Sequence, residues 1–364
     1  MAQAALRVPT ETVGSVDSEP DVPRRAGGHW NLVALGVLVA AVAAGLATGP
    51  VSLPVGGIVK ELLDRLPFLS VDSGLTELQR ATVWEIRAPR VVVGMLVGAM
   101  LSVAGGSYQG AFRNPLADPY LLGVAAGAGL GATVAIAAGA DAGSSMLSAV
   151  PLAAFAGSVI AVMLTYVVGG VGRRASATSL VLAGVAIASF LTAVQTYVQQ
   201  RNSDVLREVY SWILGRLTVV GWTDVWLVLP YIVVASAVLL VMRRTLDVMA
   251  VGDEEATTLG IRVPRARMIV VVAASLGTAA AVAVSGLIGF VGIIVPHTVR
   301  LVVGGSYRRI LPLSMIFGAA FLLVTDLLAR TVISPAELPI GVITAFIGAP
   351  FFLVVLRSRR MGAR

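Results

Sequence analysis

The chain has 364 residues, of which 57% are hydrophobic and only 13% are charged, and its formal net charge is +7. Soluble domains carry about 25% charged residues, so this composition excludes an ordinary cytosolic enzyme and a disordered chain. The lack of cysteine excludes disulfides and thiol chemistry, and two histidines are too few for a histidine-rich metal centre. In so apolar a chain, an excess of arginine indicates membrane topology before nucleic-acid binding.

Ten apolar segments follow one another along the chain, and a membrane-crossing helix needs about 20 such residues. They lie near residues 31–48, 91–112, 121–140, 149–170, 179–199, 224–242, 267–286, 287–303, 310–329 and 338–357. The eighth is short and contains Pro296, so we expect a broken or tilted helix there. Residues 212–220 are apolar but too short to cross, which predicts a surface helix or a packed loop. The expected fold class is all-α, a polytopic membrane domain over residues 30–357.

Basic residues indicate the orientation of these spans. Ten spans place both chain ends on one side, and with the N-terminus inside about two thirds of the basic residues fall on inner segments. We therefore expect both termini in the cytoplasm. Residues 1–29 are polar and predict a disordered cytoplasmic tail, because the apolar run begins too late for a cleaved secretory signal. Residues 358–364 predict a second, short cytoplasmic tail.

Small residues recur at four-residue spacing inside the spans. Gly94 and Gly98 form one such pair, and Gly123, Gly127 and Gly131 form a longer run. Helices with this spacing can bring their backbones close together, which is how helices associate in lipid. The pattern predicts a tightly packed bundle rather than a substrate site.

The chain carries no energy source of its own. A phosphate-binding P-loop ends in Gly-Lys-Ser/Thr, but the only lysine, Lys60, precedes Glu61. Any ATP with its magnesium must therefore be bound by a partner subunit, and no cofactor is expected in this chain. The clearest ionisable residue within a span is Asp326, which an i,i+4 pair with Arg330 would neutralise. The alternative is a proton-coupled carrier that uses Asp326 as its relay.

Three segments are polar in a way that a simple connecting loop does not require. Arg87-Ala88-Pro89-Arg90 precedes the second span, and Pro89 disfavours helix at Ala88 and suits a helix start. The inner turn 113–119 reads Arg-Asn-Pro-Leu-Ala-Asp-Pro. The C-terminal pieces include a Pro-His pair at 296–297 and Glu-Leu-Pro-Ile-Gly at 337–341.

In this order and spacing, the pieces resemble the FecCD-type permeases, the membrane subunits of bacterial ABC importers for ferric siderophores, haem and cobalamin. The resemblance covers residues 84–356. It implies ten spans per subunit and a pair of permeases, with a second copy or a paralogue as the partner. It also implies two ABC ATPase subunits inside and a substrate-binding protein outside, within the cytoplasmic (inner) membrane. Membrane lipid surrounds such a subunit, and no nucleic acid is expected.

The resemblance assigns roles to two groups of residues. Arg87, Arg90 and Arg330 match the arginines that meet carboxylates of the binding protein, where guanidinium–carboxylate pairs give register and affinity. The alternative to a docking role is that Arg87 and Arg90 simply snorkel at the membrane interface. The second group matches the cytoplasmic gate of the family and consists of Asn114, Leu116, Ala177 and Thr178. Ala177 departs from the hydroxyl side chain that the family pattern has at that position.

The inner segment 246–261 matches the coupling helix that inserts into the ATPase. Its residues in this role are Gly252, Asp253, Glu254, Glu255, Leu259 and Gly260. Good helix formers occupy 253–259, and a glycine at 260 is typical of a helix C-terminus. By itself, without the resemblance, the segment favours a solvated cytoplasmic helix.

The expected function is the permease subunit of an ATP-driven importer, not an enzyme. Ferric siderophore is the first choice of cargo, with haem and cobalamin as alternatives within the same family. Cavity-lining side chains are expected from the second, fifth, eighth and tenth spans. A non-transporting scaffold or receptor would leave the polar gate turn without a role.

Overall fold

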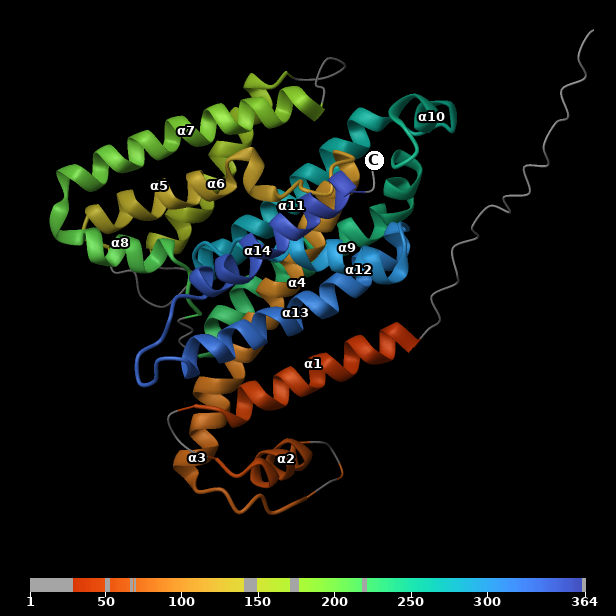
Figure 1. Cartoon of the computed structure of the whole chain (residues 1–364). Helices are drawn as coiled ribbons and strands as arrows, with labels where there is room; N and C mark the ends of the chain where they lie inside the picture. Colours follow the sequence, from red (N-terminus) through yellow and green to blue (C-terminus); the bar gives the residue numbers. More distant parts are fainter. Residues whose placement is uncertain are drawn as a thin grey trace, which may run out of the picture.

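The structure, a computed structural model, describes residues 29–49, 53–65, 68, 70–140, 149–170, 177–217 and 221–361 (Figure 1). These residues form helices joined by turns, with no strand among them. The predicted N-terminal tail therefore lies outside the described residues, apart from His29. The helix at the C-terminal end runs on to Met361, past residue 357, where the sequence predicts the start of a tail.

Seven helical stretches are long and apolar enough to cross a membrane. They are α1 (His29–Ala47), the continuous stretch Glu77–Ala111 that ends in α4 (Ala88–Ala111), α6 (Ala149–Val168), α7 (Ala177–Arg201), α9 (Trp222–Met249), α11 (Val263–Ser285) and α13 (Tyr307–Thr331). Three shorter apolar helical segments complete the series: α5 (Val124–Ala137), α12 (Val291–Val303) and the apolar part, Ile340–Val355, of α14 (Ile340–Met361). The predicted all-α membrane fold is confirmed, and its ten segments recur in order.

Short elements connect the long helices. They are α2 (Val55–Asp64), α3 (Glu77–Ala81), η1 (Thr82–Arg87), η2 (Pro119–Leu122), η3 (Ser203–Val205), α8 (Leu206–Ile213) and α10 (Asp253–Thr258). In Figure 1, α2 and α3 lie at one end of the molecule and α10 at the other. We call these the α3 end and the α10 end. Of the apolar segment 212–220, the described residues 212–217 form the end of α8 and the turn after it, which is too short to cross a membrane, as predicted.

Two predicted spans are shorter in the structure than in the sequence analysis. Helix α5 has 14 residues, about 21 Å at 1.5 Å per residue, because it starts only after the left-handed Gly123 (φ 87°). Helix α12 has 13 residues and is not broken at Pro296. Proline cannot donate to the carbonyl four residues earlier, which here is Gly292 O, but Gln109 Nε2 donates to that oxygen at 3.2 Å. The side chain from α4 thus replaces the missing hydrogen bond and keeps α12 continuous.

Pro89 lies in the first turn of α4, as its suitability for a helix start predicts, but Ala88 is helical too, contrary to the expectation that Pro89 disfavours helix there. The helix runs unbroken from Glu77, and its turns widen to the π form over Thr82–Arg87, directly before Ala88. A π segment of this kind accommodates a residue that the regular α ladder cannot. The wider turns therefore carry the helix through the proline.

Helix α4 forms the centre of the bundle and is buried along most of its length. It packs against α9, α11, α12 and α13. A Cβ added at Gly98 would lie 2.3 Å from Gly318 O of α13, and one at Gly105 would lie 2.0 Å from Gly292 O of α12. Backbone contact this close requires glycine, so the small residues pack the bundle.

Helices α5, α6 and α7 form a second packed group beside this centre (Figure 1). Gly127 and Gly131 meet the backbone of α6 in the same manner, with added Cβ atoms 2.2 Å from Gly157 O and 2.0 Å from Ala153 O. The outer faces of α7 and α14 expose large apolar side chains such as Phe190 and Phe346.

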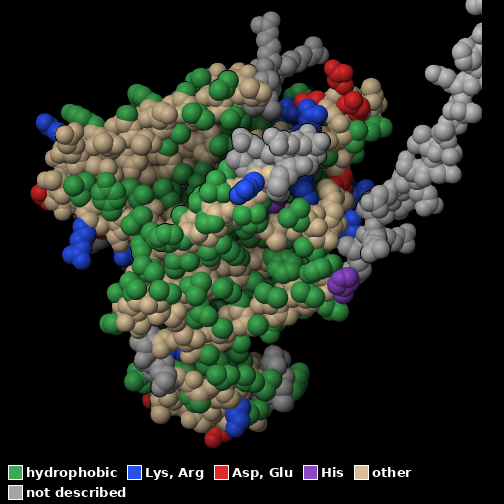
Figure 2. All heavy atoms as spheres, in the orientation of Figure 1, with side chains coloured by type: hydrophobic (Ala, Val, Ile, Leu, Met, Phe, Trp, Pro, Cys, Tyr) green, Lys and Arg blue, Asp and Glu red, His purple; other side chains and the backbone are tan. Residues whose placement is uncertain are grey.

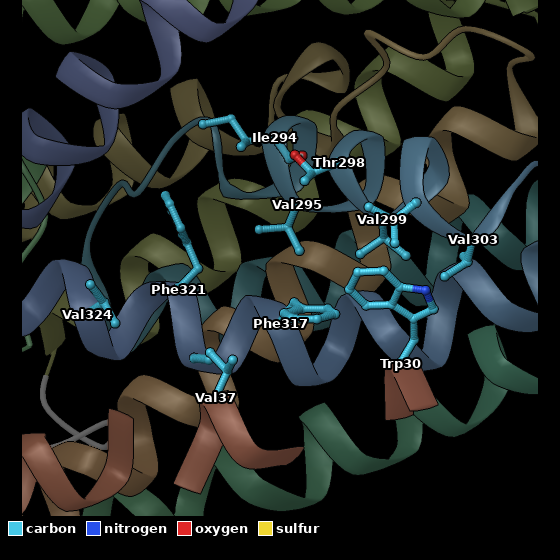
Figure 3. A pocket seen from close by; sticks show the side chains of 12 residues that line it. Trp30, Val37, Ile294, Val295, Thr298, Val299, Val303, Phe317, Phe321 and Val324 are labelled. Carbon is cyan, nitrogen blue, oxygen red and sulfur yellow. The ribbon is translucent and has the colours of Figure 1, made fainter. Parts of the chain in front are cut away.

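The visible surface has the pattern of a membrane protein. Figure 2 shows hydrophobic side chains over the middle of this face, with charged side chains mostly toward the ends of the helices. A groove of about 490 Å³ runs between α1, α12 and α13. Figure 3 shows its walls, where the Thr298 hydroxyl lies among apolar side chains that include Trp30, Phe317 and Phe321. Such a groove suits lipid chains and offers no charge to a polar cargo.

Candidate functional site

Two of the three arginines predicted as docking residues, Arg90 and Arg330, meet at the α3 end on one buried carboxylate. Asp326 on α13 is 1% exposed, and its oxygens lie 2.8 Å from Arg90 Nη2 and 3.0 Å from Arg330 Nε. The predicted Asp326–Arg330 pair is therefore present, but it is Asp326 that is shared between two guanidinium groups. The shared carboxylate ties the start of α4 to the end of α13.

Arg90 has a second carboxylate partner at the rim of this cluster. Its Nη2 lies 2.9 Å from Glu337 Oε2, and its Nη1 donates to Glu337 Oε1 at 3.0 Å. Burial favours the neutral acid, but the hydrogen bonds and charge of Arg90 outweigh this and lower the pKa of Glu337. The side chain of Glu337 is 48% exposed, so this pair reaches the surface.

The other two arginines hold the C-terminal end of α1. Arg87 Nη1 donates to Leu46 O at 2.7 Å and to Ala47 O at 2.9 Å, and Arg330 Nη1 donates to Thr48 O at 2.9 Å. The last carbonyls of a helix lack partners and carry partial negative charge, which arginine satisfies. The structure thus brings Arg87, Arg90 and Arg330 together, with all three engaged by groups of the same chain.

At the α10 end, α4 finishes in a Schellman motif with an unusual residue. Asn114 N donates to Gln109 O, and Arg113 N donates to Gly110 O. Arg113 occupies the left-handed position of this motif, with φ 49°, where glycine is the usual residue. A non-glycine residue there costs about 1 kcal/mol, and such strain often marks a functional position.

The predicted gate residues lie on two elements that meet at η2. Asn114 Oδ1 accepts from Leu116 N at 3.0 Å, which closes the turn after α4. Ala177 and Thr178 begin α7, and Thr178 is exposed. Helix α7 packs on η2 at Gly184, where an added Cβ would lie 2.1 Å from Leu121 O. Among the described residues, no hydrogen bond joins the two predicted pairs.

A polar cluster beside this turn escapes sequence analysis. The Tyr120 hydroxyl donates to Ile288 O at 3.1 Å and accepts from Ile288 N at 3.2 Å. Asp118 Oδ1 accepts from Tyr120 N at 2.8 Å, and burial raises the pKa of Asp118 to about 6. Together with Gln109, these side chains fix the segment that enters α12, where Phe290 also adopts φ 67°. No sequence pattern links residues 109–120 to 288–292.

A hollow of about 500 Å³ lies next to this segment. It is lined by α8, the α11–α12 turn and α14, through residues that include Leu214, Phe290 and Phe346. Phe290 packs on Gly348 of α14, where an added Cβ would lie 2.2 Å from the ring. The hollow includes the start of the predicted eighth span, 287–303, and part of the tenth, two of the four spans from which we expect cavity-lining side chains.

The predicted coupling segment contains a well-defined short helix, α10. Ile261 N donates to Ala256 O and Gly260 N to Thr257 O, so a Schellman motif ends the helix at Gly260 (φ 85°), the glycine that the sequence indicates. Gly252 precedes the helix, and its carbonyl accepts from Ala256 N at 2.9 Å. Ala256 is fully buried against α9 and α11, in a small cluster with Met249 and Val263.

The outward side of α10 is acidic and apolar at once. Glu254 and Glu255 are exposed, and Leu259 is 68% exposed. In Figure 1 the helix projects at its end of the bundle. An exposed acidic turn with an apolar anchor is suited to a protein partner rather than to lipid.

Asp253 is the exception among the acidic residues of α10, because it turns inward to two arginines. Its oxygens lie 2.9 Å from Arg267 Nη2 and 3.6 Å from Arg113 Nη2. Arg267 is 6% exposed, and its Nε also donates to Ala111 O at the end of α4. Sequence analysis missed Arg267 and the role of Arg113, since nothing in the spacing pairs them with residue 253.

Asp247 is a second inner carboxylate that the sequence did not single out. Its side chain accepts from Ser306 Oγ and Tyr307 N at the start of α13, and Arg308 Nε lies 3.4 Å away. It joins α9 to α13 just before α10. Among the described residues, no group of three His, Asp or Glu side chains is placed to hold a metal ion.

Comparison with known proteins identifies the family that this helical bundle matches. Residues 37–358 match the FecCD transport family. The chain is 43% identical over 290 residues to the cobalamin import system permease protein BtuC of Halobacterium salinarum, covering 80% of this chain and 77% of that one. It is 38% identical to the Fe(3+) dicitrate transport system permease protein FecD of Escherichia coli, over 76% and 85% of the two chains.

A solved structure shares the fold. It is described as an inward-facing conformation of a metal-chelate type ABC transporter, and it superposes with a TM-score of 0.76 at 27% identity, covering 90% of this chain and 98% of that one. The family match spans nearly all of the helical bundle described above. The chain therefore belongs to the FecCD transport family, as a multi-pass membrane permease subunit of an ABC importer whose ATPase is a separate subunit.

Proposed function

We propose that the chain forms half of the pathway through which an ABC importer moves a large metal chelate, first a ferric siderophore, across the cytoplasmic membrane. A second permease copy or paralogue forms the other half, two ATPase subunits drive it, and a binding protein delivers the cargo. Both termini lie in the cytoplasm in this proposal. The observation that carries it is the family match over residues 37–358, joined to a helix, α10, whose exposed side suits a protein partner.

The ATPase contact is assigned to α10. Glu254, Glu255 and Leu259 face outward, while Ala256 anchors the helix to the bundle. Gly252 and Gly260 set where this short helix begins and ends. The helix can therefore pass a displacement of the ATPase to the helices on which it rests.

The binding protein is assigned to the α3 end. Arg90 is the docking arginine best able to change partners, because it is 17% exposed and its second carboxylate, Glu337, lies at the rim. A carboxylate of the binding protein would replace Glu337 on Arg90. Arg87 and Arg330 would then support the site by fixing α1 beside it.

The pathway is assigned to the face that includes the hollow beside Phe290. Exposed apolar side chains on α7 and α14 are suited to meet a second permease, which would enclose the hollow between two subunits. Asn114, Leu116, Ala177 and Thr178 would close its inner end. A wide apolar wall binds a bulky chelate weakly, which suits passage rather than retention.

Cobalamin is the second candidate cargo, favoured by one observation. The permease of Halobacterium salinarum, at 43% identity, is named for cobalamin import, whereas FecD of Escherichia coli, at 38%, is named for ferric dicitrate. Both are large metal chelates, so the same apolar pathway serves either.

The test is uptake by membrane vesicles that hold the chain with its ATPase and binding protein. Labelled ferric siderophore, ferric citrate, haem and cobalamin are offered in parallel, with ATP or a non-hydrolysable analogue inside. The proposal expects ATP-dependent uptake of ferric siderophore above the others. Uptake of cobalamin alone would select the second candidate, and uptake indifferent to ATP would contradict both.

A further inference from the structure

The side chains of Arg113 and Arg267 meet on Asp253, and this contact joins α10 to the end of α4. Arg267 bridges the two elements directly: its Nη2 lies 2.9 Å from Asp253 Oδ2, and its Nε donates to Ala111 O at 3.0 Å. Arg113, the first residue after Phe112 at the end of α4, lies 3.6 Å from Asp253 Oδ1. One carboxylate of α10 is thus held by two arginines, and both of them are anchored at the end of α4.

The backbone of Arg113 supports a role for its side chain. Glycine would suit its left-handed position better, because a Cβ is unfavourable at φ 49°. The turn therefore carries a strained residue whose guanidinium reaches α10. Three residues later in the same turn is Leu116, one of the predicted gate residues, and Asn114 closes the turn between them.

Burial distinguishes this contact from an ordinary surface ion pair. The side chain of Arg267 is 7% exposed and that of Asp253 is 40% exposed, so water screens the Arg267 side of the pair poorly. Surface pairs hold elements together weakly, whereas the Arg267 guanidinium is held on two sides, by Asp253 at Nη2 and by Ala111 O at Nε. Asp253 accepts two hydrogen bonds from Arg267 Nη2, at 2.9 and 3.1 Å.

We infer that Arg113 and Arg267 are positioning residues that make α10 and the gate turn after α4 move as one unit. When the ATPase displaces α10, Asp253 carries the displacement to Ala111 and Arg113, and so to the turn with Asn114 and Leu116. This inference rests on the proposed function, since it assumes that α10 meets the ATPase. It adds the residues through which that contact reaches the gate.

Arg113→Gly is the most informative variant. It removes the guanidinium and relieves the backbone, so the folded state is kept or stabilised. Asp253→Asn keeps the size of the side chain but removes the charge. Arg113→Lys retains the positive charge and is expected to restore part of the effect. The matched controls are Arg262→Gln and Arg265→Gln, each of which removes an exposed arginine at the same end.

The first readout is the amount of chelate imported per ATP hydrolysed in vesicles with the ATPase and binding protein. Arg113→Gly and Asp253→Asn are expected to lower this ratio about fivefold or more, the lower limit of a typical coupling free energy between sites, while ATP hydrolysis continues. The control variants are expected to keep the ratio of the unmodified chain. A ratio unchanged in Arg113→Gly and Asp253→Asn would overturn the inference.

The second readout needs no ATPase and separates this inference from the proposed function. The chain has no cysteine, so Leu116→Cys and Thr258→Cys place two spin labels without background. The distance between the labels is expected to be narrowly distributed in the otherwise unmodified chain and broad in Arg113→Gly and Asp253→Asn. Identical distributions would overturn the rigid link. If the labels behave as expected but the unmodified chain imports nothing with ATP, the proposed function fails and the mechanical link stands.

Discussion

The two ends of α4 both carry arginines gathered on an aspartate, yet the clusters differ in what surrounds the carboxylate. At the α3 end Asp326 is 1% exposed and pairs with Arg90 and Arg330, while Arg330 and the neighbouring Arg87 satisfy the backbone at the end of α1. At the α10 end Asp253 is 40% exposed and sits on a helix of six residues. The first cluster joins three long helices, while the second joins two long helices, α4 and α11, to a short projecting one.

This difference indicates that the two arginine–aspartate clusters have different functions. A buried carboxylate between two guanidinium groups fixes the relative position of α4 and α13, because separating them would leave charges uncompensated. A half-exposed pair on a short helix can instead transmit movement from outside. The α3 end is thus a rigid joint with an accessible rim at Arg90 and Glu337, and the α10 end is a link.

Asp326→Asn is expected to give the largest effect, because it leaves Arg90 and Arg330 without their shared charge. Breaking a buried ion pair from one side costs about 3–5 kcal/mol, so the variant should lose most of its thermal stability in detergent. Glu337→Gln is the matched control at the half-exposed partner of Arg90, and about 1 kcal/mol or less is expected there. Equal losses in the two variants would contradict a rigid joint centred on Asp326.

Arg87→Met is expected to have a smaller effect, confined to α1. It removes the Arg87 Nη1 donor to Leu46 O and Ala47 O while keeping an apolar stem of similar length, and the loss of this one charged donor costs about 1.5–3 kcal/mol. Limited proteolysis after α1 should become faster, with little change around α10. Arg87→Lys keeps the positive charge at the helix end and should recover part of the protection. Unchanged cleavage in Arg87→Met would show that α1 does not depend on this arginine.

Asp118 is a third carboxylate to compare with Asp326 and Asp253. It is buried and accepts a backbone hydrogen bond, and no ion pair in the described part of the chain neutralises it. Burial raises its pKa to about 6 from an ordinary value of 3.8. As pH rises through this window the unfolded chain gives up the proton first, so the folded state loses stability. Between pH 4 and pH 7, the thermal stability of Asp118→Asn should therefore fall less than that of the unmodified chain. At pH 4 the two proteins should have similar thermal stability. Parallel curves for the two proteins would contradict this account of Asp118.

The order and class of the helices could be predicted from sequence because hydrophobic length is a property of each segment alone. The pairing of Asp326 with Arg330 and the glycine end of α10 at Gly260 are likewise local patterns, four residues apart or within one turn. The shortness of α5 could not be foreseen, because its apolar run is longer than the part that follows Gly123 in helical form.

Contacts between distant segments account for the rest. Pro296 predicts a broken helix unless Gln109, from another helix, supplies the missing donor to Gly292 O. Arg267 meets Asp253 from the next helix, and Arg90 meets Asp326 across 236 positions of sequence. The three predicted docking arginines lie near one another, and the contacts of Arg87 and Arg330 with α1 depend on three helices meeting, which no local pattern encodes.

The central claim is that the partner ATPase drives import by acting on α10. Its most direct test is a measurement of chelate uptake by the Leu259→Arg variant. This change places a charge on the exposed apolar anchor of α10 and leaves its buried side intact. The account predicts that the variant folds, no longer holds the ATPase subunit, and loses ATP-dependent uptake of the chelate. Uptake that persists in Leu259→Arg without ATP and follows an imposed pH gradient would contradict the claim and favour a proton-coupled carrier.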